Sequence, residues 1–409
     1  MAVNLAPPGA LATISGARWA TAAAAIKQGG RDDIAVLALP EHATVAGVLT
    51  RNAFAAAPVA LVRAHLAQAR PRALLVNSGN ANAGTGAAGL ADARQLCAQV
   101  AQALGVETAQ VLPFSTGVIG ERLPLAQMQA ALSALTPGAF DEAGWLAAAK
   151  AIMTTDTVAK AASRSIEYQG ADGRRETVAL TGIAKGAGMI RPDMATMLAF
   201  IATDAQIEQP QLQQLLHAVT AESFNAISVD GDTSTNDACM LCATGQGPTL
   251  APTQPGWQEF AEALASLAQE LAQAIVRDAE GATRFITLAI QGARDSEAAR
   301  AVAFTIAHSP LVKTACFAGD PNWGRILAAL GRAPLAQLDI DRVNIALDDV
   351  AVIRNGEPAA EYREAAGARV MAQSEFTLHV DLGQGDAAAT IWTCDLSYDY
   401  VRINAEYRS

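Results

Sequence analysis

The stretch KGAGMIRPDMATMLAF, residues 185–200, joins a cationic, glycine-rich turn to a strongly apolar run. On the two sides of this turn, the apolar residues of Thr177–Ala184 and Met194–Ala202 predict two strands. Thr196 stands at the start of the second run, directly after the small residue Ala195. A threonine in that position is compatible either with ordinary packing in a buried strand or with chemistry at the strand's end.

Strand-like and helix-like runs alternate along the rest of the chain. The predicted strands are Asp33–Leu39, Ala73–Asn77, Gln110–Phe114, Val343–Ile353, Glu375–Leu382 and Ala387–Leu396, with turns at Asn355-Gly356 and at 383–386. The predicted helices are Gly89–Leu104, Leu125–Leu135, Glu142–Met153, one that begins near Pro210, Trp257–Val276 and Asn322–Leu330. Because no Pro/Ser-rich linker divides the chain, we expect an α/β fold, an α+β layered sandwich whose parts are in intimate contact.

The composition is that of a globular protein. Of the 409 residues, 51% are apolar and 17% are charged, which excludes the disordered class. The formal net charge of -11 argues against a nucleic-acid partner, which would need a basic face. We expect no secretory signal, because no basic segment precedes a continuous apolar stretch, and no membrane-spanning segment. The small, odd number of five cysteines favours a reduced, cytoplasmic setting.

Three short motifs invite specific functions that their context does not support. Gly84–Gly89 has the form G-x-G-x-x-G, but a polar segment separates it from the preceding strand, and the next strand ends without a carboxylate. We therefore expect a side-chain-bonded loop at the edge of a site. Asp230–Asp237 is similar to a calcium loop but lacks the glycine and the glutamate at its sixth and twelfth positions. Cys239 and Cys242 form a CxxC without a second pair, so we expect buried thiols.

Thr196 becomes a candidate nucleophile if the chain is cut in front of it. A threonine hydroxyl needs a base, and no histidine lies close in sequence to a plausible nucleophile. Cleavage of the Ala195–Thr196 bond would supply one, because an α-amine has a reference pKa of about 7.7–8.0. The hydroxyl can make the cut by attacking the Ala195 carbonyl, which gives an ester that water opens. From the residues alone, a buried strand threonine and a self-generated nucleophile both remain open.

Long motifs carry a resemblance that spans essentially the whole chain. They are KGAGM (185–189) with ATML (195–198), NSGNANA (77–83), STGVIG (115–120), MTTDT (153–157), SVDGDTSTND (228–237), EGAT (280–283), GDPNWGR (319–325) and YVRINAEYRS (400–409). In this order they are similar to the motifs of the ornithine acetyltransferase family, also called bifunctional glutamate N-acetyltransferase, of arginine biosynthesis.

The resemblance implies a self-cleaving enzyme with an N-terminal nucleophile. The expected products of cleavage are an α chain, residues 1–195, and a β chain, residues 196–409, which stay together in an α2β2 heterotetramer. The implied reaction moves an acetyl group from N2-acetyl-L-ornithine to L-glutamate through acetyl-Thr196, by a ping-pong route. No metal or cofactor is implied. Use of acetyl-CoA as a second donor is left open, because monofunctional and bifunctional members share these motifs.

The resemblance also implies roles for individual residues. Thr196 is the expected nucleophile, and the Thr116 hydroxyl and the Gly117 backbone N–H are the expected oxyanion hole. Lys185 would pair with the substrate carboxylate and Glu280 with the ornithine ammonium; without the resemblance, both read as solvated surface residues. The other expected substrate contacts are Thr154 or Thr155, together with Asn404 and Ser409 in the C-terminal tail.

Two rival functions remain. An aminopeptidase-like amidohydrolase would use the same nucleophile with water as the acceptor. A non-catalytic amino-acid-binding protein would keep the bond before Thr196 intact. Release of acetate without acetylglutamate would favour the first rival, and a single uncut polypeptide would favour the second.

Overall fold

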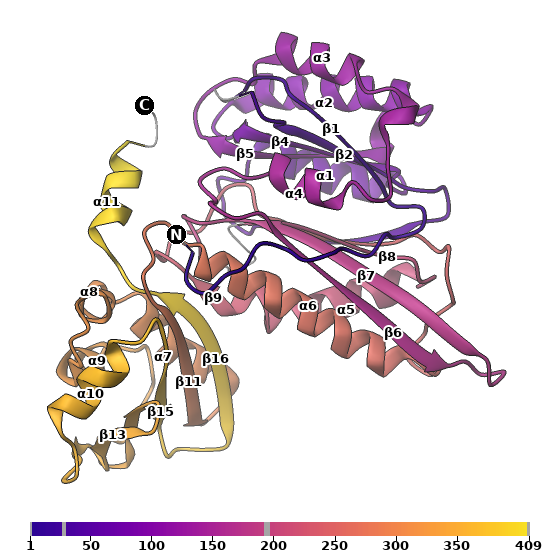
Figure 1. Ribbon diagram of the computed structural model, residues 1–409. Helices are drawn as coiled ribbons and strands as arrows, with labels where there is room; N and C mark the ends of the chain where they lie inside the picture. The colour runs from indigo at the N-terminus through magenta and orange to yellow at the C-terminus, as the bar shows by residue number, and fades with distance from the viewer. Residues whose placement is uncertain (1, 27–29, 192–196, 407–409) are drawn as a thin grey trace.

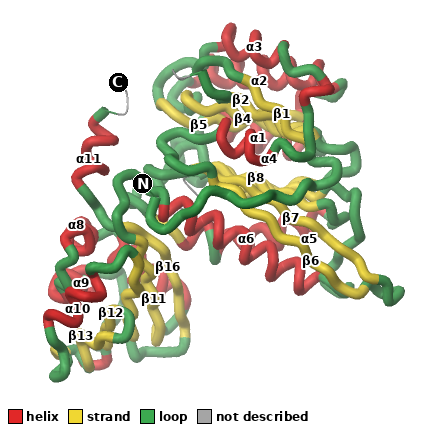
Figure 2. Tube along the Cα trace, in the orientation of Figure 1, coloured by secondary structure: helices red, strands yellow, loops and turns green. Residues whose placement is uncertain are grey.

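The computed structural model describes residues 2–26, 30–191 and 197–406, which form three β-sheets with helices against them (Figure 1; Figure 2). The first sheet has the order β1 (Arg18–Ala22), β2 (Ile34–Ala38), β4 (Ala73–Asn80), β5 (Val111–Val118). The second has the order β3 (Thr44–Leu49), β10 (Ala238–Ala243), β8 (Leu198–Thr203), β7 (Arg175–Lys185), β6 (Lys160–Gln169). The third has the order β14 (Glu357–Pro358), β13 (Val350–Arg354), β12 (Asn344–Leu347), β15 (Glu375–Asp381), β11 (Phe285–Ala293), β16 (Ala387–Cys394), β9 (Ile227–Ser228).

Helices pack on these sheets, and one of them, Trp145–Ala151, packs between the first two, so the predicted mixture of helices and strands is confirmed. They are α1 (Ala57–Gln68), α2 (Gly86–Leu104), α3 (Leu125–Ser133), α4 (Trp145–Ala151), α5 (Gln209–Ala221), α6 (Trp257–Arg277), α7 (Ser296–Ala307), α8 (Pro310–Ala318), α9 (Trp323–Gly331), α10 (Glu364–Met371) and α11 (Tyr398–Ala405). α2 and α3 share a core with the first sheet, and α5 and α6 share one with the second. The two sheets face each other across a separate apolar core.

β8 is apolar from Leu198 to Ala202, and both of its faces are buried. Phe200 contacts Phe114 of the first sheet edge-on, with ring centroids 5.1 Å apart. Ala199 and Ile201 point the other way, into the core shared with α5 and α6. A strand buried on both faces is strongly fixed in register. The run that starts at Met197 is therefore anchored in the core.

The two strands predicted around the glycine-rich turn are confirmed within the described residues. β7 contains the whole of Thr177–Ala184 and pairs antiparallel with β8, so that Lys185 lies opposite Leu198. Residues 194–196 of the second predicted strand lie outside the described residues. The pairing places the glycine-rich turn at one end of two buried strands.

The predicted single strand Val343–Ile353 is wrong, because the structure divides it into β12 and β13. Asp348 forms the turn between them with a φ of 48°, a conformation that aspartate tolerates better than most residues. Its carboxylate accepts a hydrogen bond of 2.7 Å from the Thr377 backbone N–H. The polar pair Asp348-Asp349 thus forms the turn of a hairpin between β12 and β13.

Candidate active site

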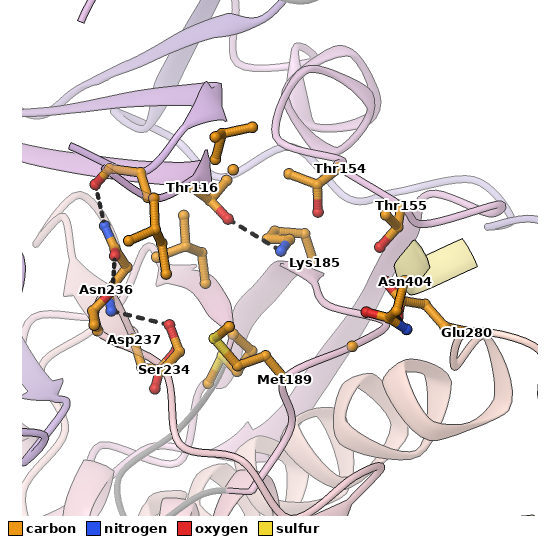
Figure 3. A pocket seen from close by; sticks show the side chains of 18 residues that line it. Thr116, Thr154, Thr155, Lys185, Met189, Ser234, Asn236, Asp237, Glu280 and Asn404 are labelled. Atoms are coloured by element: carbon orange, nitrogen blue, oxygen red, sulfur yellow. Dashed lines mark hydrogen bonds between the residues drawn. The ribbon is translucent and has the colours of Figure 1, made fainter. Parts of the chain in front are cut away.

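The site is a cavity of about 250 Å³ where the ends of strands from the first two sheets meet α11 (Figure 3). Its lining is Ala81, Thr116–Ile119, Thr154, Thr155, Lys185, Gly188, Met189, Met197, Leu198, Ser234–Asp237, Glu280 and Asn404. In Figure 3, Glu280 and Asn404 lie at one end, Asn236 and Asp237 lie at the other, and Lys185 lies between them. The cavity therefore presents charged groups of both signs.

The structure brings together the predicted site residues that it describes. Thr116, Gly117, Thr154, Thr155, Lys185, Glu280 and Asn404 all line the same cavity. The predicted cleavage residues Ala195 and Thr196, and the predicted tail contact Ser409, lie outside the described residues. Met197, which follows Thr196 in the chain, lines the cavity.

The end of β5 forms the wall that carries Thr116 and Gly117. Gly117 has a φ of 133°, and a side chain there would put its Cβ only 2.2 Å from the backbone carbonyl carbon of Gly79 on the neighbouring strand. Only glycine fits such a close approach of two backbones. Asn236 supports the same wall, because its side-chain amide donates to the carbonyl oxygens of Ala81 at 2.6 Å and Ser115 at 2.9 Å.

Lys185 ends β7 and is almost completely buried beside this wall. Its Nζ donates to the Thr116 hydroxyl oxygen at 3.2 Å. Burial lowers the pKa of Lys185, while the carboxylates of Asp156, Asp237 and Glu280 act to raise it. Lys185 thus lies in a poorly solvated place, where the neighbouring carboxylates favour its charged form.

A buried ion cluster lies next to Lys185. The ammonium of Lys160 contacts Asp156 and Asp278, each at 2.7 Å, and all three side chains are 0–1% exposed. Burial opposes ionisation of Asp156, but the charges of Lys160 and Lys185 outweigh it and hold its pKa below the usual value. Both carboxylates of this cluster also accept hydrogen bonds from backbone N–H groups, as buried charges require.

The opposite end of the cavity carries Glu280, just past α6. Its carboxylate accepts a hydrogen bond of 2.8 Å from the side-chain amide of Asn404 on α11. A side chain at Gly188 would put its Cβ 2.4 Å from a Glu280 carboxylate oxygen, so the glycine-rich turn leaves room for that carboxylate. Ser397 is the N-cap of α11, and its hydroxyl donates a hydrogen bond of 2.6 Å to the Gly281 carbonyl, which ties the helix to the same loop.

Sequence reasoning missed two carboxyl groups at this site. Asp156 and Asp237 lie in motifs that carried the family resemblance, but no spacing rule marks either of them as part of a site. Asp237 is 2% exposed, and within the described residues its Oδ2 has no hydrogen-bond partner. Burial raises its pKa well above the ordinary value, against the opposing effects of Ser234 and Lys185. The only signal in the sequence was their place inside the motifs that carry the resemblance.

The three rejected motifs have structural roles. In the glycine-rich loop, the Thr85 hydroxyl donates to the Asn82 side chain at 2.7 Å, as expected for a side-chain-bonded loop. The Asp230 carboxylate accepts from the backbone N–H of Met189 at 2.6 Å and of Ile190 at 3.0 Å, which fixes the turn after Lys185. The two thiols of the CxxC are buried and free, as predicted.

Two features of the described residues bear on other kinds of function. Among the described residues, no three His, Cys, Asp or Glu side chains gather as metal ligands. Within the same residues, no single helix is long and apolar enough to cross a membrane, and α7 and α8 reach that length only as a pair bent by 59°.

Comparison with known proteins gives matches along nearly the whole chain. A model of the ArgJ family matches residues 18–409. The "Arginine biosynthesis bifunctional protein ArgJ" of Methylococcus capsulatus is 56% identical over 98% of this chain and 97% of the relative. The protein of the same name from Pseudomonas fluorescens is 49% identical over 100% of both chains.

Solved structures are also similar in part. The ArgJ protein of Bacillus halodurans is 42% identical, with a TM-score of 0.49 over 52% of this chain and 100% of that chain. Ornithine acetyltransferase of Mycobacterium tuberculosis, complexed with ornithine, is 35% identical, with a TM-score of 0.38 over 46% of this chain and 97% of that chain.

Proposed function

This chain belongs to the ArgJ family, and we therefore propose that it is a glutamate N-acetyltransferase that moves the acetyl group of N2-acetyl-L-ornithine to L-glutamate. The products are L-ornithine and N-acetyl-L-glutamate, in arginine biosynthesis. The observation that carries the proposal is that Thr116, Gly117, Lys185 and Glu280 line one cavity with Met197, the residue after the proposed nucleophile.

The active form is produced by autocatalytic cleavage of the Ala195–Thr196 peptide bond. The Thr196 hydroxyl oxygen forms a bond to the Ala195 carbonyl carbon as the carbon–nitrogen bond breaks, and the hydroxyl proton goes to the departing nitrogen. Water then opens the ester, which leaves a carboxylate on Ala195 and an amine on Thr196. The α chain, 1–195, and the β chain, 196–409, stay associated because the second sheet contains strands of both.

Acetyl transfer uses the new amine as the base for its own hydroxyl. Thr196 attacks the acetyl carbonyl of the substrate, its amine takes the hydroxyl proton, and ornithine leaves with that proton on its nitrogen. The amine of glutamate then attacks the carbonyl carbon of the acetyl ester, and the bond from that carbon to the Thr196 oxygen breaks. The proton from the glutamate nitrogen passes through the Thr196 amine to the Thr196 oxygen as N-acetylglutamate leaves.

The oxyanion of each step is stabilised by Thr116 and Gly117. Because the Thr116 oxygen accepts a hydrogen bond from Lys185, the hydrogen of that hydroxyl is free to point at the oxyanion. Donors that are fixed before the reaction contribute about 10²- to 10³-fold each to the rate. The contact of Gly117 with Gly79 fixes the second donor in the same way.

Substrate is held by charges at two places in the cavity. Lys185 pairs with the carboxylate, and Glu280 pairs with the side-chain ammonium of ornithine while Asn404 fixes its orientation. Thr154 and Thr155 both line the cavity. Ser409 of the tail is proposed as a further substrate contact on the family resemblance alone. We also propose an α2β2 heterotetramer in the cytoplasm that works without metal or cofactor, nucleic acid or membrane. The name "bifunctional" of the relatives favours acetyl-CoA as a second acetyl donor.

The test compares wild type with Thr196→Ala. We expect wild type to give two fragments on a denaturing gel, a new terminus reading Thr-Met-Leu-Ala, and acetylglutamate from N2-acetylornithine and glutamate. Thr196→Ala should stay one polypeptide without transfer, whereas Thr203→Ala, at the other end of β8, should cleave and transfer. Acetate without acetylglutamate would identify a hydrolase, and an uncut wild type would identify a binding protein.

A further inference from the structure

Asp156 links two parts of the cavity wall through one carboxylate. One oxygen accepts from the Gly186 backbone N–H at 2.8 Å, directly after Lys185, and the other accepts from the Thr154 backbone N–H at 2.9 Å. The first oxygen also contacts the Lys160 ammonium at 2.7 Å. A completely buried side chain with this set of partners fixes the position of both wall segments.

Asp278 also contacts Lys160, but its backbone partners lie in a different segment, residues 157–158. Its carboxylate contacts Lys160 at 2.7 Å and accepts from the backbone N–H groups of Thr157 at 2.9 Å and Val158 at 3.2 Å. Two aspartates thus share one cation, and only Asp156 also bonds to the residue that follows Lys185.

The charged groups around Lys185 come from four segments of the chain. They are Asp156 after α4, Lys160 on β6, Asp237 before β10 and Glu280 after α6. Of the carboxyl groups, Asp237 is itself driven toward its neutral form by burial, and Glu280 already bonds to Asn404. Asp156 is driven toward its charged form by the two lysines. Of these three carboxyl groups, Asp156 is therefore the one whose environment most favours the charged form near Lys185.

We propose that Asp156 is a positioning residue that keeps Lys185 a charged ammonium facing the cavity and thereby makes the site select substrates with a free carboxylate. This inference rests on the proposed function, in which Lys185 binds the carboxylate. The role differs from mere support of the fold, because it predicts discrimination between an acid and the matching neutral amide.

The test uses Asp156→Asn, which keeps the shape and removes the charge, with Asp278→Asn as the matched control. Transfer to glutamate is measured with N2-acetylornithine and with its carboxamide, and folding is followed by thermal unfolding. Loss of an opposite charge at short range lowers a lysine pKa by about one unit or more. We expect KM for the acid to rise about tenfold or more in Asp156→Asn, with little change for the carboxamide. When the pH is raised, KM for the acid should begin to increase at a lower pH in Asp156→Asn than in wild type.

Asp278→Asn removes the same kind of charge from the same buried cluster, so it should lower the unfolding temperature but keep the acid-to-carboxamide ratio. An unchanged ratio in Asp156→Asn, or an equal loss in Asp278→Asn, would overturn the inference. If Asp156→Asn does not fold, wild type decides: its preference for the acid must fall as the pH is raised, and a constant preference overturns the proposal. Lack of any transfer by wild type would instead defeat the proposed function.

Discussion

The inner and outer walls of the cavity are held in different ways. The inner wall, Thr116, Gly117 and Lys185, consists of residues on two buried strands, and its positions are fixed by backbone contacts and buried hydrogen bonds. The outer wall, Glu280 and Asn404, joins a loop to α11, a helix without a buried residue that stands clear of the third sheet in Figure 1. The inner wall is therefore suited to stabilising a transition state, and the outer wall to holding or releasing substrate.

Gly117→Ala should break the inner wall most completely. The added Cβ would collide with the backbone of Gly79, which cannot move without disturbing β4, and it would displace the oxyanion donor. We expect kcat to fall by about 10³-fold or more, together with a lower unfolding temperature. Steady-state transfer and thermal unfolding measure the two effects.

Gly120→Ala is the matched control for this substitution. Gly120 also has a positive φ, 88°, but nothing lies within 4 Å of an added Cβ. It should cost about 1 kcal/mol of stability from backbone strain and leave kcat nearly unchanged. An equal fall in kcat for both variants would mean that strain in the loop, and not the close approach of two strands, explains the loss.

Thr116→Ala should remove one oxyanion donor and leave the backbone in place. We expect kcat to fall by about 10²- to 10³-fold with a smaller change in KM. Thr116→Ser, which keeps the hydroxyl, should recover most of the activity. A rise in KM at constant kcat would move Thr116 from the oxyanion hole to substrate binding.

The sequence predicted more of the inner wall than of its supports. The apolar run after Met197 was sufficient to predict β8, because a strand buried on both faces has a distinctive composition. The motif that contains Asp156 was visible, but its role depends on the Gly186 backbone N–H, 30 positions away in the numbering and close only in the folded chain. No local pattern encodes such a pair. The error at Val343–Ile353 has the opposite cause, since the local pair Asp348-Asp349 was overlooked inside an apolar run.

Asp237→Asn tests a buried carboxyl group of the cavity next to the inner wall. Because burial raises its pKa, the folded protein holds this proton to a higher pH than the unfolded chain, whose aspartate pKa is about 3.9. The stability that this group contributes is complete below the pKa of the unfolded chain. It is lost as the pH rises from there through the folded pKa, with a slope of at most about 1.4 kcal/mol per pH unit. Relative to wild type, Asp237→Asn should therefore gain stability with rising pH in urea unfolding between pH 4 and 9. Parallel curves for the two proteins would show that Asp237 is ionised in the folded state.

Asn404→Ala should have the smallest effect, because it removes one part-buried side-chain hydrogen bond, while the Ser397 hydroxyl still ties α11 to the Gly281 carbonyl. Loss of a bond to a charged group that is partly solvated costs about 1 kcal/mol, so KM for N2-acetylornithine should rise roughly three- to tenfold with kcat almost unchanged. Arg402→Ala, on the same helix with an exposed ion-pair partner, is the control and should leave KM unaltered. A large fall in kcat for Asn404→Ala would mean that α11 acts in the transition state, and the distinction between the two walls would fail.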